Sequence, residues 1–270
     1  MDRIILVNTN TFHGFTIEEA LPLIKKAGFK YIELTATKGW TEHVFPNQSF
    51  EYLSKIKALI EELGLTVIGF SGHTSLMDQN RLKDFILNME LANFFNAKYI
   101  VSSIGEAHIK NDNTSSNNQL IENLKYLIPY LKKYNLELAL ETHGTEFADG
   151  ESLNKIVNAV NSDLIKINLD TANVLFYGNK LPEDDLLTCV DNVSYMHIKD
   201  KGGKTNEWNF PAIGKGYINF EKIFDILNKK SNNCPLSIEI EFTEKGVSDI
   251  TEVYQALKDS YETLEKLKMI

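Results

Sequence analysis

Eight short apolar runs rich in β-branched residues alternate with longer segments whose apolar residues recur at three- and four-residue spacing. The first pattern is typical of buried strands and the second of amphipathic helices. Strict alternation of strands and helices implies a parallel sheet, and eight such units in 270 residues predict a single-domain (β/α)8 TIM barrel over residues 1–270. The strands are expected at residues 4–8, 30–34, 65–70, 97–103, 136–141, 164–170, 193–197 and 235–241.

The competing architecture is a doubly wound open sheet, which usually has a glycine-rich turn after its first strand. Here the residues from Asn8 to His13 contain no glycine, which favours the barrel. The first helix is expected within residues 16–28, where Gly28 offers a C-terminal stop. Its apolar stripe consists of Ile17, Ala20, Leu21 and Ile24.

The composition narrows the class of partner. A net charge of −9, with 37 acidic and 28 basic residues of which only Arg3 and Arg81 are arginine, disfavours nucleic acid. No apolar run reaches membrane length, there is no secretory leader pattern, and Cys189 and Cys234 are too few for a disulfide framework. We therefore expect a cytoplasmic protein that acts on a small molecule, without nucleic-acid or membrane partners. The sequence does not decide whether the protein is a monomer or a homo-oligomer.

Four side chains with metal-binding chemistry stand at the ends of successive predicted strands. Glu141, Asp170, His197 and Glu239 are spaced by 29, 27 and 42 residues, which leaves room for a helix between each pair. In a parallel barrel, the carboxyl ends of all strands open on the same face, where active sites lie. We therefore expect the four to meet and to supply a divalent-cation site and a general acid/base pair.

Histidines and residue pairs point to the same face. All six histidines follow or end a predicted strand, namely His13, His43, His73, His108, His143 and His197. Residues two apart share one side of a strand, so His143, Lys199 and Glu241 are expected on the same side as Glu141, His197 and Glu239. Long loops are predicted at 104–118 and 198–219, and the apolar centre of the second, around Trp208, suggests that it packs over something.

The segments ETHG (141–144), LDTANVLFYG (169–178), MHIKDK (196–201), IGKGYINF (213–220) and LSIEIE (236–241) resemble the sugar phosphate isomerase/epimerase family of xylose isomerase-like barrels. The resemblance spans the chain from the first strand to the last helix. It implies one divalent cation held by Glu141, Asp170, His197 and Glu239. Manganese is the expected metal, and Mg²⁺, Co²⁺ and Zn²⁺ are the alternatives. Glu241 shares the inward side and is an alternative to Glu239 as the fourth ligand.

The resemblance also implies the chemistry: isomerisation or epimerisation of a sugar or keto-sugar substrate. A cation that holds a carbonyl and its neighbouring hydroxyl would stabilise an enediolate, while the catalytic pair Glu141 and Glu239 removes and returns a proton. Lys199 is expected to orient a substrate oxygen, to support His197 or to form an ion pair with Asp200. The expected substrate-binding residues are His73, His143, Asn173, Lys199, Trp208 and Glu241.

Two departures leave the substrate open. Ketose 3-epimerases of this family typically carry histidine where this chain has Asn173, and an arginine soon after the residue matched by His197, where this chain has none. The alternative is a metal-dependent lyase or dehydratase acting on an inosose or keto-glycoside. An abasic-site DNA endonuclease is less favoured, because its three-zinc cluster needs a histidine at the Asn173 position. A non-catalytic sugar-binding barrel is disfavoured because uncompensated inward acids are costly to bury.

Overall fold

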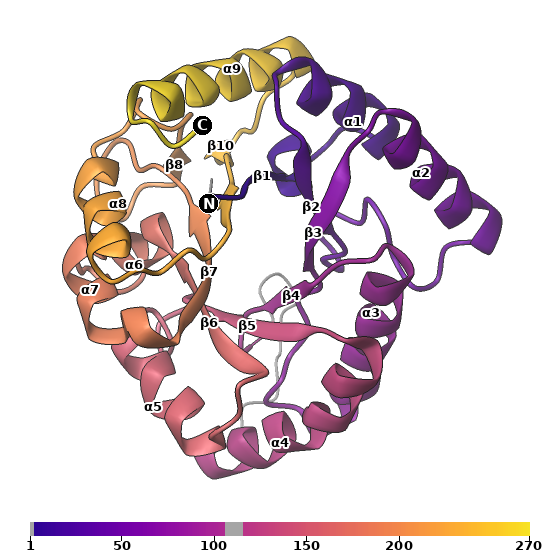
Figure 1. The fold of residues 1–270 in the computed structure, drawn as a ribbon, viewed down its shortest axis with the longest axis vertical. Coiled ribbons are helices and arrows are strands. Elements are labelled where there is room, and N and C mark those ends of the chain that lie inside the picture. Colours follow the sequence, from indigo (N-terminus) through magenta and orange to yellow (C-terminus); the bar gives the residue numbers. More distant parts are fainter. Residues whose placement is uncertain (1–2, 106–115) are drawn as a thin grey trace.

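The computed structural model describes residues 3–105 and 116–270 and shows a closed barrel of eight parallel strands surrounded by helices (Figure 1). The last barrel strand pairs in parallel with both the seventh and the first, which closes the sheet. The predicted TIM barrel is therefore confirmed. The barrel strands are β1 (Ile5–Asn8), β2 (Tyr31–Thr35), β3 (Thr66–Ser71), β4 (Tyr99–Ser102), β5 (Glu137–Glu141), β6 (Ile165–Asp170), β7 (Val193–Ile198) and β9 (Leu236–Ile238).

The helices lie outside the barrel (Figure 1). Their apolar residues belong to the buried core that they share with the strands. The first helix shows why the local sequence folds this way: Thr16 and Glu19 form a capping box at its start, and its four predicted stripe residues are buried. Gly28, with φ of +105°, reverses the chain just after the helix ends. The helices are α1 (Ile17–Lys26), α2 (Phe50–Glu62), α3 (Leu82–Phe94), α4 (Asn117–Tyr134), α5 (Gly150–Val160), α6 (Thr171–Phe176), α7 (Pro182–Cys189), α8 (Phe220–Lys229) and α9 (Ile250–Lys266).

The structure refines the expected elements at three places. The run at 235–241 is a strand only from Leu236 to Ile238, and the chain then forms β10 (Phe242–Thr243), which pairs antiparallel with β8 (Asn209–Phe210). Two helices, α6 and α7, occupy the connection from β6 to β7, where the alternation of strands and helices predicted one. Residues 106–115, which include His108 and most of the loop expected at 104–118, lie outside the described residues.

The lumen of the barrel is divided into an apolar layer and a polar layer. Leu6, Ile68, Val101, Ala139 and Tyr195 form a buried cluster of their own, separate from the core between strands and helices. Side chains two residues further along β1, β5 and β7 belong to the next layer towards the carboxyl ends of the strands. That next layer is polar, so the apolar cluster acts as its floor.

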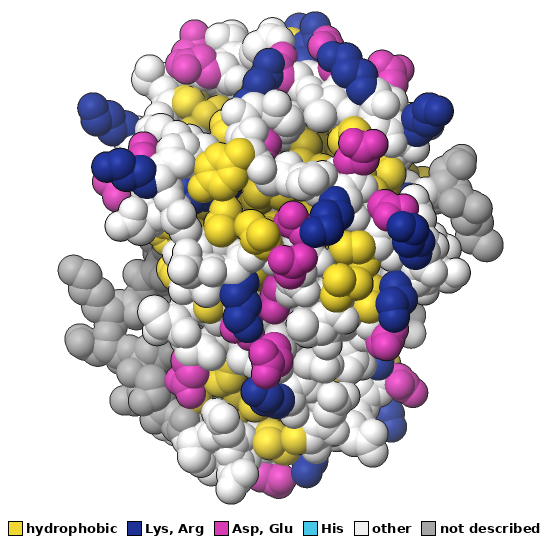
Figure 2. All heavy atoms as spheres, turned by 90° about the vertical axis from the view of Figure 1, so that its left-hand side faces the viewer, with side chains coloured by type: hydrophobic (Ala, Val, Ile, Leu, Met, Phe, Trp, Pro, Cys, Tyr) yellow, Lys and Arg dark blue, Asp and Glu magenta, His cyan; other side chains and the backbone are white. Residues whose placement is uncertain are grey.

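The outer surface is mixed in charge. Figure 2 shows the side that carries α7 and α8, where Lys and Arg side chains are interspersed with Asp and Glu. In the described part of the chain, no helix combines the length and the apolar character needed to cross a membrane.

His43, just after β2, makes the stability of the fold depend on pH. It is buried with Nε2 3.0 Å from the carbonyl oxygen of Phe15, and burial lowers the pKa of His43 to about 4. Because the unfolded chain has a histidine pKa of about 6.5, it binds the proton first, and the folded state loses stability as pH falls from 6.5 towards 4. We expect a loss of roughly 3 kcal/mol from this residue by pH 4, following 1.36 kcal/mol per pKa unit.

Urea unfolding of the wild type and of His43→Gln at pH 7, 5.5 and 4.5 measures this effect. Glutamine retains an amide donor for the Phe15 carbonyl but does not titrate. The variant should therefore lose less stability than the wild type over this range. Equal losses in the two proteins would contradict the assignment.

Candidate metal and sugar site

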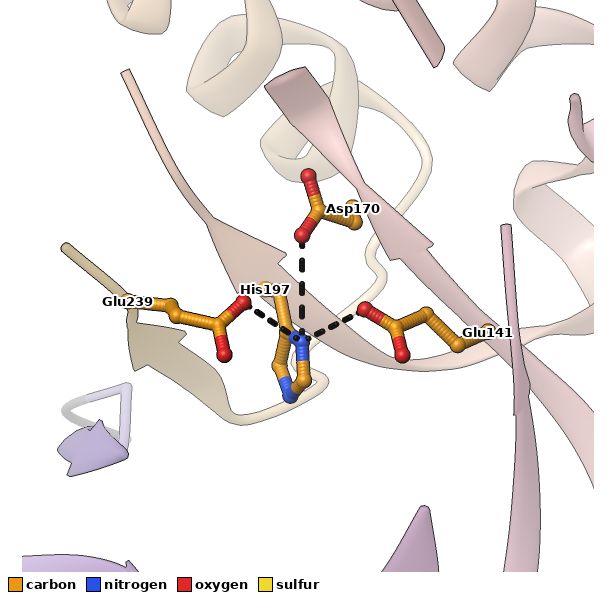
Figure 3. A group of neighbouring side chains, drawn as sticks. All are labelled: Glu141, Asp170, His197 and Glu239. Carbon is orange, nitrogen blue, oxygen red and sulfur yellow. Dashed lines mark hydrogen bonds and ion pairs between the residues drawn. The ribbon is translucent and has the colours of Figure 1, made fainter. Parts of the chain in front are cut away.

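Four side chains from β5, β6, β7 and the end of β9 meet at the carboxyl end of the barrel (Figure 3). One ligand atom from each lies within 4.8 Å of the others. Nδ1 of His197 is 3.0 Å from Oε1 of Glu141, 3.5 Å from Oε2 of Glu239 and 3.9 Å from Oδ2 of Asp170. The expected meeting of the four residues is thus present in the structure, while their roles as metal ligands stay a prediction.

The local backbone orients the carboxylate of Asp170. Its Oδ1 accepts hydrogen bonds from the backbone N–H groups of Ala172 (2.9 Å) and Asn173 (2.8 Å) and thereby caps α6. Its Oδ2 is left to face His197, its partner across the β6–β7 pair. One oxygen of Asp170 therefore caps the helix, and the other faces the cluster around His197.

Glu239 is held from the opposite side by the turn after β1. The side-chain amides of Asn10 and Asn8 donate to its Oε1 at 2.9 and 3.3 Å, and Lys199 Nζ lies 3.0 Å from its Oε2. Burial alone raises the pKa of Glu239, but Lys199 and His197 bring it below its usual value. The two asparagines were not predicted as site residues, although Asn8 ends the first strand and Asn10 lies in the glycine-free turn after it, which was a usable signal.

A fourth buried carboxylate, Glu33 on β2, lies on the far side of the imidazole. Both of its oxygens are 3.1 Å from Nε2 of His197, and the Tyr195 hydroxyl donates to Oε2 at 2.8 Å. Glycine at position 69 makes room for this contact, since a Cβ there would collide with the Tyr195 hydroxyl. Glu33 thus directs Nδ1 of His197 towards the three other carboxylates, an arrangement common around metal-binding histidines. Sequence reasoning missed Glu33; its only signal was an acid inside an apolar run.

Carboxylates outnumber cationic side chains in this buried cluster. Burial by itself lowers the pKa of Lys199, but the carboxylates around it raise that pKa well above its usual value. Burial raises the pKa of Asp170 to about 7, which reflects the cost of a further negative charge. Three carboxylate oxygens and one imidazole nitrogen suit a divalent cation such as Mn²⁺ or Mg²⁺, and a cation here would offset the excess charge. The carboxylates are Glu33, Glu141, Asp170, Glu239 and Glu241, and the cationic groups are His197 and Lys199.

One expected contact is wrong. Lys199 forms no ion pair with Asp200; its Nζ lies 2.7 Å from Oε2 of Glu241 and 3.0 Å from Oε2 of Glu239. Asp200 instead accepts hydrogen bonds from the backbone N–H groups of Gly214 and Gly216, both at 2.8 Å. Both residues directly follow β7: the Lys199 side chain lies among the carboxylates of the cluster, whereas Asp200 holds the loop that follows.

A polar cavity opens directly above the cluster. His73 accepts the backbone N–H of Ser103 at Nδ1 (3.0 Å), so its Nε2 carries hydrogen and faces Oε2 of Glu141 at 3.4 Å. Burial lowers the pKa of His143 to about 4, which keeps that ring neutral at pH 7. All six expected substrate-binding residues line the cavity: His73, His143, Asn173, Lys199, Trp208 and Glu241. The lining also includes residues that were not predicted, among them Asn10, Thr35, Ser71, Trp40 and Tyr177.

Comparison with known proteins places the chain in a family. The family model described as "Xylose isomerase-like TIM barrel" matches residues 21–264. The chain belongs to the xylose isomerase-like TIM barrel family. A curated relative, "Probable endonuclease 4" from Mycoplasmopsis synoviae (strain 53), is 25% identical over 183 residues, 62% of this chain and 65% of that protein. This chain therefore spans slightly less than two thirds of that relative's length.

Solved structures with the same fold include enzymes that act on sugars. A D-psicose 3-epimerase structure is 14% identical with a TM-score of 0.77, and each chain is covered to 99%. A structure of the IOLI protein with a zinc atom is 17% identical with a TM-score of 0.78, covering 99% of this chain and 98% of that one. A probable 3-DHS dehydratase, AsbF from Bacillus anthracis, is 17% identical with a TM-score of 0.73, covering 97% and 98%. At these identities, the likeness shows the fold alone.

In this xylose isomerase-like barrel, the contact between Glu33 and His197 leads to a prediction. Glu33→Gln removes the charge that holds Nε2–H and weakens the orientation and basicity of the imidazole. We expect Mn²⁺ to bind roughly 10- to 100-fold more weakly, the usual effect of losing such an outer partner. Isothermal titration calorimetry measures the affinity, and Tyr195→Phe, which removes only the hydroxyl bound to Glu33, should cause a smaller loss. An unchanged affinity in Glu33→Gln would show that this carboxylate does not support the metal site.

Proposed function

We propose that this protein is a divalent-metal-dependent isomerase or epimerase that acts on a sugar or keto-sugar. The observation that carries the proposal is the double placement of Glu141 and Glu239. Both belong to the cluster around Nδ1 of His197, and both line the polar cavity above it. Two carboxylates that border one cavity next to a cation site match the needs of proton transfer beside a carbonyl.

The metal would be held by Glu141, Asp170, His197 and Glu239, whose donor atoms suit manganese or magnesium. When bound, a divalent cation supplies electrostatic stabilisation to the negative charge that develops on substrate oxygens during proton abstraction. The remaining work falls to the chain itself. Lys199 and Asn173 lie in the cavity wall, where they can donate hydrogen bonds to substrate hydroxyls or the carbonyl.

Glu141 and Glu239 would act as the acid/base pair. Each is held by fixed donors: Nδ2 of Asn173 lies 3.4 Å from Oε1 of Glu141, and Asn10 and Lys199 hold Glu239. The lowered pKa values of both glutamates keep them ionised at neutral pH and ready to accept a proton. One takes the proton from the carbon next to the carbonyl. If the other glutamate takes a proton from solvent and gives it to the opposite face of that carbon, the product is the epimer. If a proton is instead given to the former carbonyl carbon, while the hydroxyl proton passes to the former carbonyl oxygen, the product is the isomer.

Solvent exchange tests this function directly. Mn-loaded protein is incubated in deuterated water with ketoses, inososes and keto-glycosides, and the products are followed by NMR. We expect deuterium to enter a single carbon adjacent to the carbonyl, in a metal-dependent reaction. Absence of exchange across the panel, together with absence of metal binding, would rule the proposal out.

Two other functions have specific support and are separated by their products and metal content. A lyase or dehydratase, favoured by the structural likeness to AsbF, would release water or another leaving group from the carbon next to the exchanged one. An endonuclease is suggested by the name of the curated relative. The abasic-site enzymes considered in the sequence analysis would hold three zinc ions per chain. Among residues 3–105 and 116–270, one group of four candidate ligands was found, which supports a single ion. Metal analysis that gave three tightly bound zincs would favour the nuclease.

A further inference from the structure

The polar cavity continues into a larger outer chamber. The two share five lining residues, Asn10, Trp40, Tyr177, Trp208 and Glu241, so the second opens directly over the first. The inner cavity offers about 30 Å³, whereas the outer chamber offers about 410 Å³. An inner volume of this size accommodates only a few atoms near the metal cluster, while the outer one falls within the range of ligand sites. A bound substrate therefore extends outwards.

Aromatic rings form the walls of the outer chamber and are held in place. Trp40 stacks on His13 with ring centroids 3.9 Å apart and 10° between the planes, and Nδ1 of His13 lies 2.8 Å from the hydroxyl of Thr41. Trp208 meets Trp40 edge to face at 6.4 Å and packs against Phe210 at 5.2 Å. Rigid flat rings offer a large apolar contact area at little cost in conformational entropy.

Hydrogen bonds made by two buried side chains, Asp200 and Lys201, hold the loop that carries Trp208. Asp200 accepts backbone N–H groups near its end, and Nζ of Lys201 is buried against the carbonyl oxygens of Gly202, Lys204 and Glu207 at 2.6–2.8 Å. The position of Trp208 is therefore built into the fold.

The charges of the outer chamber disfavour an anionic ligand group. The described residues that line it include one lysine, Lys245, two acids, Glu241 and Glu244, and no arginine. Glu241 is already paired with Lys199 in the inner cavity. Proteins bind phosphate with arginine side chains, clustered cationic side chains or a helix N-terminus. The described residues that line this chamber include no arginine and no cluster of cationic side chains. An uncharged group fits better.

We propose that the outer chamber is a binding subsite for an uncharged ring attached to the reacting sugar, so that the substrate is a glycoside rather than a free or phosphorylated monosaccharide. The attached ring lies against Trp40 and Trp208, while the reacting sugar reaches the metal cluster. This inference rests on the proposed function for the reaction but adds the class of substrate.

The protein contains its own reporter for this subsite, because both of its tryptophans line the chamber. Tryptophan fluorescence of the Mn-loaded and EDTA-treated wild type is titrated with phenyl β-glucoside, cellobiose, methyl β-glucoside and glucose 6-phosphate. We expect saturable changes with at least tenfold tighter binding for the two ring-bearing ligands than for the methyl glucoside. Phenyl β-glucoside and cellobiose distinguish an aromatic from a sugar ring. Equal binding of all neutral ligands, or tightest binding of the phosphate, would overturn the proposal.

Substitutions sharpen the test. Trp208→Ala should reduce the preference for ring-bearing ligands by roughly tenfold, the loss of about one stacking contact, and Trp208→Phe should restore much of it. Tyr126→Ala, an exposed aromatic on α4 outside the chamber, is the matched control and should leave the preference unchanged. A preference that persists in Trp208→Ala would contradict the subsite.

The two proposals can fail separately. Binding of ring-bearing ligands with neither solvent exchange nor metal binding would overturn the isomerase function and leave the subsite standing. Solvent exchange on free monosaccharides, with no increase in affinity from an attached ring, would overturn the subsite and leave the isomerase function standing.

Discussion

Glu141→Gln and Glu239→Gln each lower the rate of solvent deuterium exchange by about 10²- to 10⁴-fold while the fold stays intact. Glutamine has nearly the same shape but cannot take up a proton, and loss of a general acid or base typically costs 10²–10⁴-fold. Because glutamine retains an oxygen donor, the variants are assayed at saturating Mn²⁺, with bound metal quantified. The rate is measured by NMR on the best substrate of the panel, and the fold by circular dichroism.

Two matched controls separate proton transfer from a general loss of charge. Glu137→Gln changes the other end of the same strand, β5, and Glu262→Gln changes an exposed acid on α9, outside both cavities. Both should retain most of the exchange rate. Full exchange in either Glu141→Gln or Glu239→Gln would show that the residue concerned does not transfer the proton.

Addition of Mn²⁺ to the metal-free protein raises the melting temperature by roughly 5–10 °C at 100 times the dissociation constant. A ligand that binds only the folded state adds about 2.7 kcal/mol at that concentration, and 1 kcal/mol shifts a domain of this size by about 2–4 °C. The physical cause is the excess of buried carboxylates over His197 and Lys199, which a divalent cation offsets. Differential scanning fluorimetry with Mn²⁺, Mg²⁺ and Zn²⁺, and with EDTA, measures the shift and ranks the metals.

Asp170→Asn is the informative variant for this effect. Asparagine keeps an acceptor for the N–H groups of Ala172 and Asn173, so the cap of α6 survives while the ligand charge is lost. The variant should fold normally and lose most of the Mn²⁺ shift. Stabilisation by Mn²⁺ that is equal in the variant and the wild type would place the metal elsewhere.

The predicted elements of the fold came from patterns that act locally. The stripe of Ile17, Ala20, Leu21 and Ile24 is buried as expected, because helical periodicity alone decides which face of α1 is apolar. Closure of the barrel followed from eight alternating units. The strand after Pro235 was predicted too long, since Glu239, Ile240 and Glu241 alternate as a strand would, yet the backbone turns away to form β10.

The residues of the candidate site likewise fall into those that the sequence predicted and those that it did not. Glu141, Asp170, His197 and Glu239 were found because parallel strands end on a common face, so that position at a strand end is sufficient to bring side chains together. Glu33 lies within a strand, and its inward direction depends on the pairing of β2 with β3, whose register shifts between Ile32 and Glu33. A two-residue period cannot say which face of a strand looks into the lumen.

The sequence by itself determined the alternation of strands and helices, and with it the barrel and the face on which the four metal-binding candidates gather. These are consequences of local periodicity and chain order. Only the tertiary structure decided that Glu33 orients His197, that Lys199 pairs with Glu239 and Glu241 rather than Asp200, and that Trp40 and Trp208 share one chamber. Such contacts join loops and strands far apart in the chain, and their geometry follows from register, loop path and packing, which no local pattern encodes.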